Sequence, residues 1–257
     1  MNPMLLSAIT DHLWQSTLFA LLAFGFALLL RDYPAKVRYW IWLAASVKFL
    51  VPFSIARPSF PTALLILWGA GGLTFFTICA VRWRRVAQTA RRAVPVTVGR
   101  EFDTLRRIEA TAGVTRPIEL RLSGSLLEPG VFGIFRPILI LPAGIGCHLS
   151  KAQLGCVIAH EISHIRRFDN LTAAIHMLVE IVFWFHPVVW WLASRLVDER
   201  ERACDEEVLK VVGQPQEYAE GLLKTCKLYV QSPVLAVSGV TGSDLKKRVS
   251  AILAVRA

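Results

Sequence analysis

Ala159-His160-Glu161-Ile162-Ser163-His164 is the stretch that decides the fold, because it predicts a helix with two imidazoles on one face. Residues four apart lie on the same side of a helix, so His160 and His164 can bind one metal ion. Zinc suits such a pair, since its catalytic sites use three protein ligands and leave a fourth position for water. Glu161 is adjacent and can accept a proton from that water.

The residues before this stretch predict where its helix begins. Ser150 and Gln153 have the spacing of a capping box, in which a hydroxyl and an amide satisfy free backbone N–H groups. Apolar residues then recur at helical spacing, and neither glycine nor proline interrupts the segment from Cys156 to Asn170. The metal motif is therefore predicted to lie inside one continuous helix.

Composition indicates a membrane protein. The chain has 257 residues, of which 54% are hydrophobic, and its net charge is +10. Soluble domains of this length rarely carry so many apolar residues. The basic residues are clustered beside apolar segments, which favours contact with a lipid bilayer, and no motif indicates direct nucleic-acid binding.

Three apolar segments predict transmembrane helices at about residues 13–30, 39–56 and 61–81, which form a membrane domain over residues 1–82. Arg31, Lys36 and Arg38 lie between the first two segments, and five arginines follow the third. Basic residues favour the cytoplasmic side. The N-terminus is therefore expected outside and residues 83–230 in the cytoplasm. Lys48 lies within a span and needs a partner.

Residues 83–150 are more polar and predict both helix and strand. Residues 102–112 have amphipathic helical spacing, residues 118–122 alternate like a half-buried strand, and residues 131–142 indicate β-structure with a bend at Pro137. The fold class expected is α+β, with a multi-helix membrane domain beside a cytoplasmic metalloprotease domain. Residues 243–255 predict a short amphipathic helix in a C-terminal tail, residues 231–257.

An acidic segment, residues 198–207, offers a third metal ligand. Glu201 and Asp205 are four residues apart, so one can bind zinc while the other orients a histidine. Spacing alone does not distinguish the two. Five cysteines without a C-x-x-C pair argue against a disulfide framework, and Cys156 or Cys204 is a less favoured ligand.

The apolar segment 171–196 is predicted to form a helical hairpin that is re-entrant or interfacial. Only 36 residues separate His164 from Glu201, whereas two full crossings need about 40 residues. Pro187 can break the helix in the middle. Such a hairpin would return Glu201 to the membrane face that carries His160.

Several motifs together resemble one family, the membrane zinc metallopeptidases of the β-lactam-sensing antirepressor systems, which are the penicillinase and methicillin-resistance sensor-transducers. The motifs that carry the resemblance are residues 12–16 (HLWQS), 131–133 (VFG), 136–138 (RPI), 141–142 (LP), 160–169 (HEISHIRRFD), 184–187 (WFHP) and 201–205 (ERACD).

The resemblance implies a gluzincin-like domain in a bacterial cytoplasmic membrane, with Zn²⁺ bound by His160, His164 and Glu201. It implies Glu161 as general base, with Asp205 and Asp169 behind the ligands. The expected activity is regulated proteolysis of a cytoplasmic repressor-type protein, of the chain itself, or of both. Substrate-binding residues are not indicated, and a homodimer is one assembly considered.

Antibiotic-sensing members continue into a further membrane helix and an extracellular penicillin-binding domain, and these 257 residues contain neither. β-Lactam sensing is therefore not expected of them. One rival function is a non-catalytic membrane transducer whose zinc is structural, with Asp205 or Cys204 closing the fourth position. A second is the prenyl-protein or HtpX-like membrane protease class, in which two full spans separate the motifs.

Overall fold

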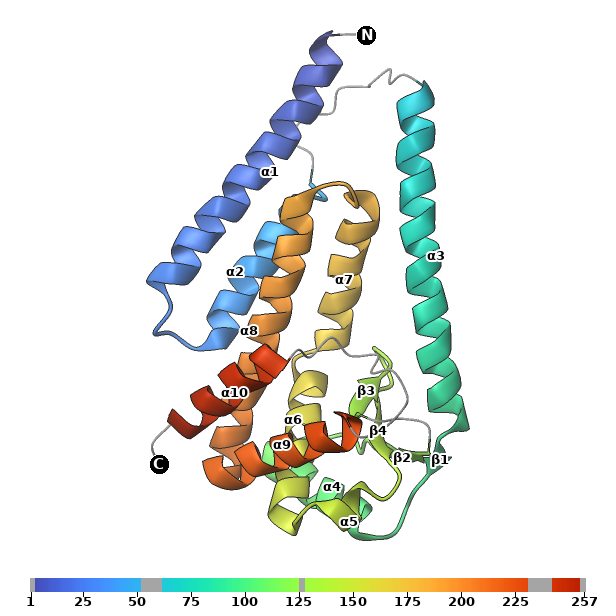
Figure 1. Cartoon of the computed structure of the whole chain (residues 1–257), viewed down its shortest axis with the longest axis vertical. Helices are drawn as coiled ribbons and strands as arrows, with labels where there is room; N and C mark the ends of the chain where they lie inside the picture. The colour runs from blue at the N-terminus through green and yellow to red at the C-terminus, as the bar shows by residue number, and fades with distance from the viewer. Residues whose placement is uncertain (1–2, 52–61, 125–127, 231–241, 255–257) are drawn as a thin grey trace. The chain divides into compact units, whose positions relative to one another are not determined.

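The computed structural model describes residues 3–51, 62–124, 128–230 and 242–254. These residues are mostly helical and include one small sheet, which confirms the expected α+β class (Figure 1). The chain divides into two compact units. The first comprises Met1–Trp83 and Leu171–Ala203, and the second comprises Arg84–Asn170 and Cys204–Ala257.

The first unit is helical. Its elements are α1 (Pro3–Leu29), α2 (Ala35–Lys48), most of α3 (Thr62–Arg92), the bulk of α7 (Asp169–Val182) and the first part of α8 (Pro187–Val212). The small residues Ala20, Ala23 and Ala27 lie at helical spacing on the buried face of α1, where α2 can approach closely. Trp42 and Leu192 are among the bulky residues of the same core, with exposed fractions of 2% and 0%.

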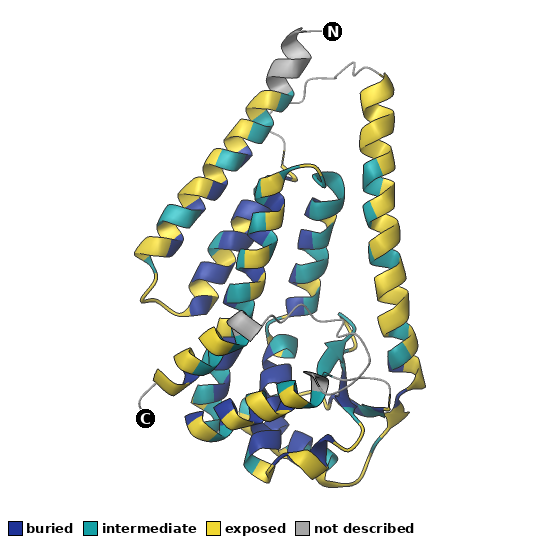
Figure 2. Ribbon diagram, viewed as in Figure 1, coloured by how far each residue is buried: buried dark blue, intermediate teal, exposed yellow. Residues whose placement is uncertain are grey.

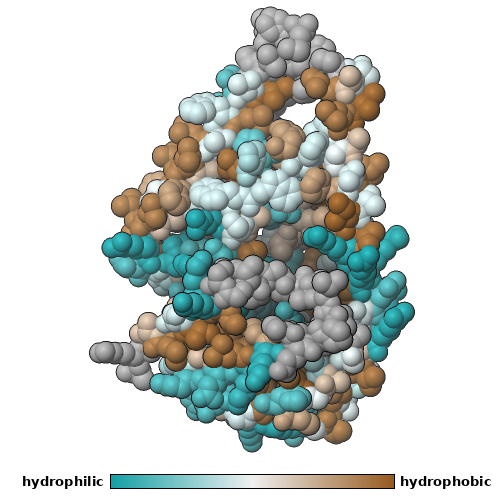
Figure 3. Space-filling model, viewed as in Figure 1, coloured by the Kyte–Doolittle hydropathy of each residue, from teal (hydrophilic) through white to brown (hydrophobic). Residues whose placement is uncertain are grey.

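Within the described residues, two helices are long and apolar enough to cross a membrane, judged by length and composition: Ile9–Leu29 within α1, and Thr62–Arg92. Large apolar side chains cover their outer faces, including Leu21, Phe26 and Leu67, each more than half exposed (Figures 2 and 3). These helices correspond to the first and third predicted spans. Apolar surface of this extent marks a membrane or protein contact.

The second predicted span, residues 39–56, is not confirmed as a transmembrane helix. The structure ends α2 at Lys48, which gives a helix of 14 residues, whereas a bilayer crossing needs about 20. Residues 52–56 lie outside the described part of the chain. Tyr39, Trp42 and Leu43 face the core of this unit. The second span therefore stays a prediction.

Buried polar contacts join α2 to the later helices of the first unit. Arg38 Nη2 lies 2.9 Å from Glu199 Oε2, with both side chains about nine-tenths buried. Ser46 Oγ lies 2.7 Å from His176 Nδ1. Lys48, for which a partner was expected, donates to Ser16 Oγ at 3.3 Å. Buried polar groups need such partners because desolvation is otherwise uncompensated.

Residues 183–186 separate α7 from α8, and Pro187 begins α8. Proline fits the first turn of a helix, where its missing N–H would have no partner. The predicted helix break at this proline is therefore confirmed. The depth of the hairpin in a bilayer stays a prediction.

The second unit contains a four-stranded sheet in the order β1-β2-β4-β3. The strands are β1 (Val94–Pro95), β2 (Glu119–Ser123), β3 (Gly130–Phe132) and β4 (Ile138–Pro142). β2 and β4 are parallel, and the other pairs are antiparallel. Gly133 allows the β3–β4 turn, because its φ is +98° and a Cβ there would lie 2.6 Å from the Arg136 carbonyl oxygen.

Helix α6 (Lys151–Arg166) runs through the core of the second unit, in contact with α4 (Arg100–Ala112), α9 (Pro215–Val230) and β3. The expected capping box is present: Ser150 Oγ accepts from Gln153 N and Gln153 Oε1 accepts from Ser150 N, both at 3.1 Å. Leu154, Ile158 and Ile162 are almost fully buried. The remaining helices are α5 (Ile145–His148) and α10 (Gly242–Ala254).

Two glycines of α3 should respond oppositely to the same substitution. A Cβ at Gly71 would lie 2.2 Å from Trp184 Cε2, whereas nothing lies within 4 Å of a Cβ at Gly69. Gly69→Ala should leave thermal stability unchanged or raise it, by up to about 1 kcal/mol from helix propensity. Gly71→Ala should lower it, because Trp184 must move. Thermal unfolding of both variants in detergent tests this, and equal stability would contradict the packing.

Candidate metal centre

Helix α6 presents His160 and His164 on one face, as their spacing predicts. Their Nε2 atoms lie 3.2 Å apart, and the ring planes are nearly perpendicular at 88°. His160 and Glu161 are buried, with exposed fractions of 8% and 9%. Because the rest of α6 is held in the core, the two imidazoles are carried on a rigid element.

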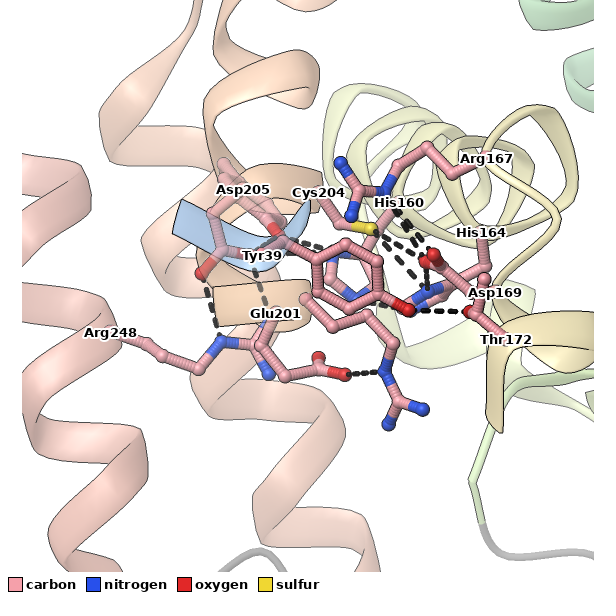
Figure 4. A network of polar contacts seen from close by, with 12 residues as sticks. Tyr39, His160, His164, Arg167, Asp169, Thr172, Glu201, Cys204, Asp205 and Arg248 are labelled. Atoms are coloured by element: carbon pink, nitrogen blue, oxygen red, sulfur yellow. Dashed lines mark hydrogen bonds and ion pairs between the residues drawn. The ribbon is translucent and has the colours of Figure 1, made fainter. Parts of the chain in front are cut away.

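The far side of the His164 ring is held by Asp169. His164 Nδ1 lies 2.8 Å from Asp169 Oδ2, and the carboxylate is 2% exposed (Figure 4). Arg167 Nε also approaches Asp169, at 3.3 Å from Oδ1. Phe168 adopts a left-handed φ of +56°, which is costly for a bulky residue and turns the chain between α6 and α7. This turn places Asp169 beside the preceding histidine.

The far side of the His160 ring is held by two groups. Tyr218 Oη in α9 lies 2.9 Å from His160 Nδ1. Asp205 Oδ1 in α8 lies 3.4 Å from the same nitrogen. Tyr218 donates its hydroxyl hydrogen to Asp205 Oδ1 at 2.5 Å, so its oxygen can accept from His160 Nδ1–H.

Electrostatics keep Tyr218 as the donor and Asp205 as the acceptor. Burial raises the pKa of Tyr218 well above its usual value, and the neighbouring Asp205 charge raises it further. Burial alone would raise the pKa of Asp205, but hydrogen bonds from His160 and Arg248 outweigh it and hold the pKa below its usual value. Tyr218 therefore stays protonated and Asp205 ionised across the neutral pH range.

These contacts determine which nitrogens are available to a metal. Each Nδ1 faces a hydrogen-bond acceptor, so we infer that Nδ1 carries the proton in both rings. The two Nε2 lone pairs then face each other at 3.2 Å with no hydrogen between them. Two nitrogens at about 2.0–2.1 Å from a tetrahedral zinc ion lie about 3.3 Å apart. The pair therefore fits a zinc ion.

Other acidic and thiol groups lie on α8. Glu201 precedes Asp205 by one turn of this continuous helix, so both lie on the same helical face. The donor atoms of His164, Asp169 and Cys204 lie within 4.8 Å of one another. Cys204 Sγ, however, lies 3.3 Å from His164 Nδ1, the nitrogen that already contacts Asp169. This thiol therefore lies on the side of the ring away from Nε2.

The residue after Asp169 joins the centre to the sheet. Asn170 Nδ2 donates to the carbonyl oxygens of Val131, at 3.1 Å, and Gly133, at 2.8 Å. Val131 belongs to β3, the outermost strand next to β4. Two consecutive residues thus contact a histidine of the pair and the edge of the sheet.

The sequence pattern anticipated His160, His164, Asp169 and Asp205, and the structure brings these four together. It did not indicate Tyr218, which lies 58 residues after His160 in an ordinary amphipathic helix. No local pattern distinguishes this tyrosine from a core aromatic residue.

Comparison with known proteins gives the family. The model described as BlaR1 peptidase M56 matches residues 56–252, about three quarters of the chain. The chain belongs to the BlaR1 peptidase M56 family. The matched residues include α6 and its histidine pair, α8, α9 and most of α10. Membership confirms the resemblance that the sequence motifs indicated.

Two curated relatives of this M56 chain are informative. Regulatory protein BlaR1 of Bacillus licheniformis is 34% identical over 139 residues, which cover 52% of this chain and 23% of the relative. Methicillin resistance mecR1 protein of Staphylococcus aureus (strain Mu50 / ATCC 700699) is 26% identical over 141 residues, covering 52% and 24%. The chain thus spans about a quarter of the length of these relatives.

Thiol reactivity tests the environment of α6. Burial raises the pKa of Cys156 to about 12, so about one thiol in ten thousand is ionised at pH 8. Cys147 is exposed. Iodoacetamide at pH 8 should alkylate Cys147 and spare Cys156 in the folded chain, and both should react in denaturant. Peptide mapping by mass spectrometry measures this, and equal labelling of the folded chain would refute the burial of Cys156.

Proposed function

We propose that this chain is a membrane-embedded, zinc-dependent endopeptidase that acts in signal transduction. The observation that carries the proposal is the pair of buried imidazoles whose Nε2 atoms face each other, while each Nδ1 is held by an acceptor. Metal-binding histidines in proteins typically show this second hydrogen bond. Membership of a peptidase family supports the same activity class.

His160, His164 and Glu201 would hold the ion. Together they offer two imidazole nitrogens and one carboxylate oxygen, a donor set that zinc accepts in proteases. Support for Glu201 over Asp205 comes from the position of Asp205, whose Oδ1 lies 3.4 Å from His160 Nδ1, on the side of the ring away from Nε2. Glu201 is one turn earlier on the same face of α8.

The chain's own residues would share the remaining work. Zinc, when bound, supplies a Lewis acid that acidifies water and polarises the scissile carbonyl. Glu161, between the two histidines on α6, would accept the proton of the attacking water and pass it to the leaving amine. Asp169, Asp205 and Tyr218 would hold the imidazoles in one tautomer and orientation.

The substrate class we propose is a cytoplasmic repressor-type protein, the chain itself, or both. Support comes from two relatives whose names describe a regulatory protein and a methicillin-resistance protein. The two apolar helices support placement in a membrane. The outside N-terminus and cytoplasmic peptidase domain follow from the distribution of basic residues. A homodimer remains one assembly to test.

The rival function, a transducer with a structural zinc site, needs a fourth protein ligand. Cys204 and Asp205 are the candidates, but both contact histidine Nδ1 atoms and lie away from the paired Nε2 atoms. An open fourth position therefore accords better with the contacts. X-ray absorption of the zinc-loaded chain would separate the two functions through the number of protein ligands.

Glu161→Gln should abolish peptide-bond hydrolysis while zinc stays bound, because the amide cannot accept the water proton. Cleavage products mapped in membranes, together with zinc content of the purified chain, measure both effects. Glu119→Gln is the matched control, since Glu119 is a half-exposed carboxylate that pairs with Arg121 on β2. Normal cleavage by the Glu161 variant would rule out the general-base role.

Glu201→Gln should weaken zinc binding by at least tenfold, because a ligand carboxylate becomes a neutral amide. Glu206→Gln is the matched control on the same helix, since five residues along a helix turn the side chain to another face. Titration against a chromogenic chelator measures both affinities. Unchanged affinity in the Glu201 variant would remove this residue from the ligand set.

A further inference from the structure

Arg248 of helix α10 contacts one of the carboxylates behind the histidine pair. Arg248 Nε lies 2.9 Å from Asp205 Oδ2, and Arg248 Nη2 lies 2.7 Å from Asp205 Oδ1 (Figure 4). Both side chains are about nine-tenths buried, with exposed fractions of 12% and 8%. This two-point contact fixes a carboxylate in plane and direction, which a single hydrogen bond does not.

The same carboxylate holds His160. Asp205 Oδ1 accepts from Tyr218 Oη at 2.5 Å, and Tyr218 Oη lies 2.9 Å from His160 Nδ1. The imidazole therefore stands at the end of a buried series that begins at Arg248. The four members lie on four different helices. They are Arg248 on α10, Asp205 on α8, Tyr218 on α9 and His160 on α6.

Loss of the guanidinium would affect the whole series. A buried carboxylate without its cation is strongly disfavoured, so it rotates towards water, takes up a proton or shifts its helix. Each response removes the acceptor that Tyr218 and His160 share. The exposed lysine of the same helix, Lys246, does not contact Asp205 in the described structure, and it serves as a comparison of equal charge.

We propose that Arg248 is a positioning residue that sets the orientation of the His160 imidazole through Asp205 and Tyr218, so that α10 is needed to complete the metal centre. The proposal rests on the zinc function proposed above. Arg248 does not touch the metal or the substrate in this proposal. Its effect on zinc is transmitted entirely through the Asp205 carboxylate.

A double-mutant cycle on zinc affinity tests this transmission. The full chain is purified in detergent as Arg248→Met, Asp205→Asn and the double variant, and each is titrated with zinc against a chromogenic chelator. Arg248→Met should weaken zinc binding about tenfold, the lower limit seen for groups behind a metal ligand. In the Asp205→Asn background, Arg248→Met should lower zinc affinity by less than about twofold, because the carboxylate through which Arg248 acts is already removed.

Two further variants make the result decisive. Lys246→Met removes the same charge from α10 and should leave zinc affinity unchanged. Arg248→Lys keeps the charge but cannot contact both oxygens in the same geometry, so an intermediate loss is expected. This variant also answers the question if Arg248→Met does not fold.

Three results would overturn the proposal. Unchanged zinc affinity in Arg248→Met and Arg248→Lys would show that Arg248 only holds α10 in place. An equal loss in the presence and absence of Asp205→Asn would show that Arg248 does not act through Asp205. Failure of the unmodified chain to bind zinc, or an unchanged affinity in His160→Ala, would overturn the proposed function and this proposal with it.

Discussion

The candidate metal centre depends on hydrogen bonds at Nδ1 of each imidazole, on the side of the ring away from Nε2. A ring with a free Nδ1 can change tautomer and rotate, and then its Nε2 lone pair is no longer directed at a ligand position. Asp169 and the Asp205–Tyr218 pair prevent this at His164 and His160. These carboxylates are themselves buried beside Arg167 and Arg248, so the stability of the centre follows from the compensation of buried charge.

Local features of the fold were predictable from sequence. The capping box and apolar spacing of α6, the break at Pro187 and the β3–β4 bend arise from interactions among neighbouring residues. The extent of α2 was not predictable, because hydropathy counts apolar residues without showing where a helix ends. The helix stops at Lys48, and residues 52–56 of the predicted span lie outside the described part of the chain. The second membrane span therefore stays a prediction.

Helical periodicity predicted only those residues of the candidate metal centre that lie within one helix. Spacing of four residues indicated the histidine pair and left Glu201 and Asp205 as alternatives, whereas Asp169 was indicated only by the family resemblance. Tyr218 and Arg248 come from helices 58 residues beyond His160 and 43 beyond Asp205. Sequence patterning placed Arg248 only within the amphipathic helix predicted for residues 243–255. No local rule separates a surface arginine from one that folds back onto a buried carboxylate.

Asn170 joins the outermost strand of the sheet to the turn that carries Asp169. Its amide occupies the carbonyl oxygens of Val131 and Gly133, while the adjacent Asp169 holds His164. The outermost strand and the imidazole are therefore fastened by neighbouring residues of the same turn. A shift of this turn would therefore move the edge of the sheet and the His164 ring together.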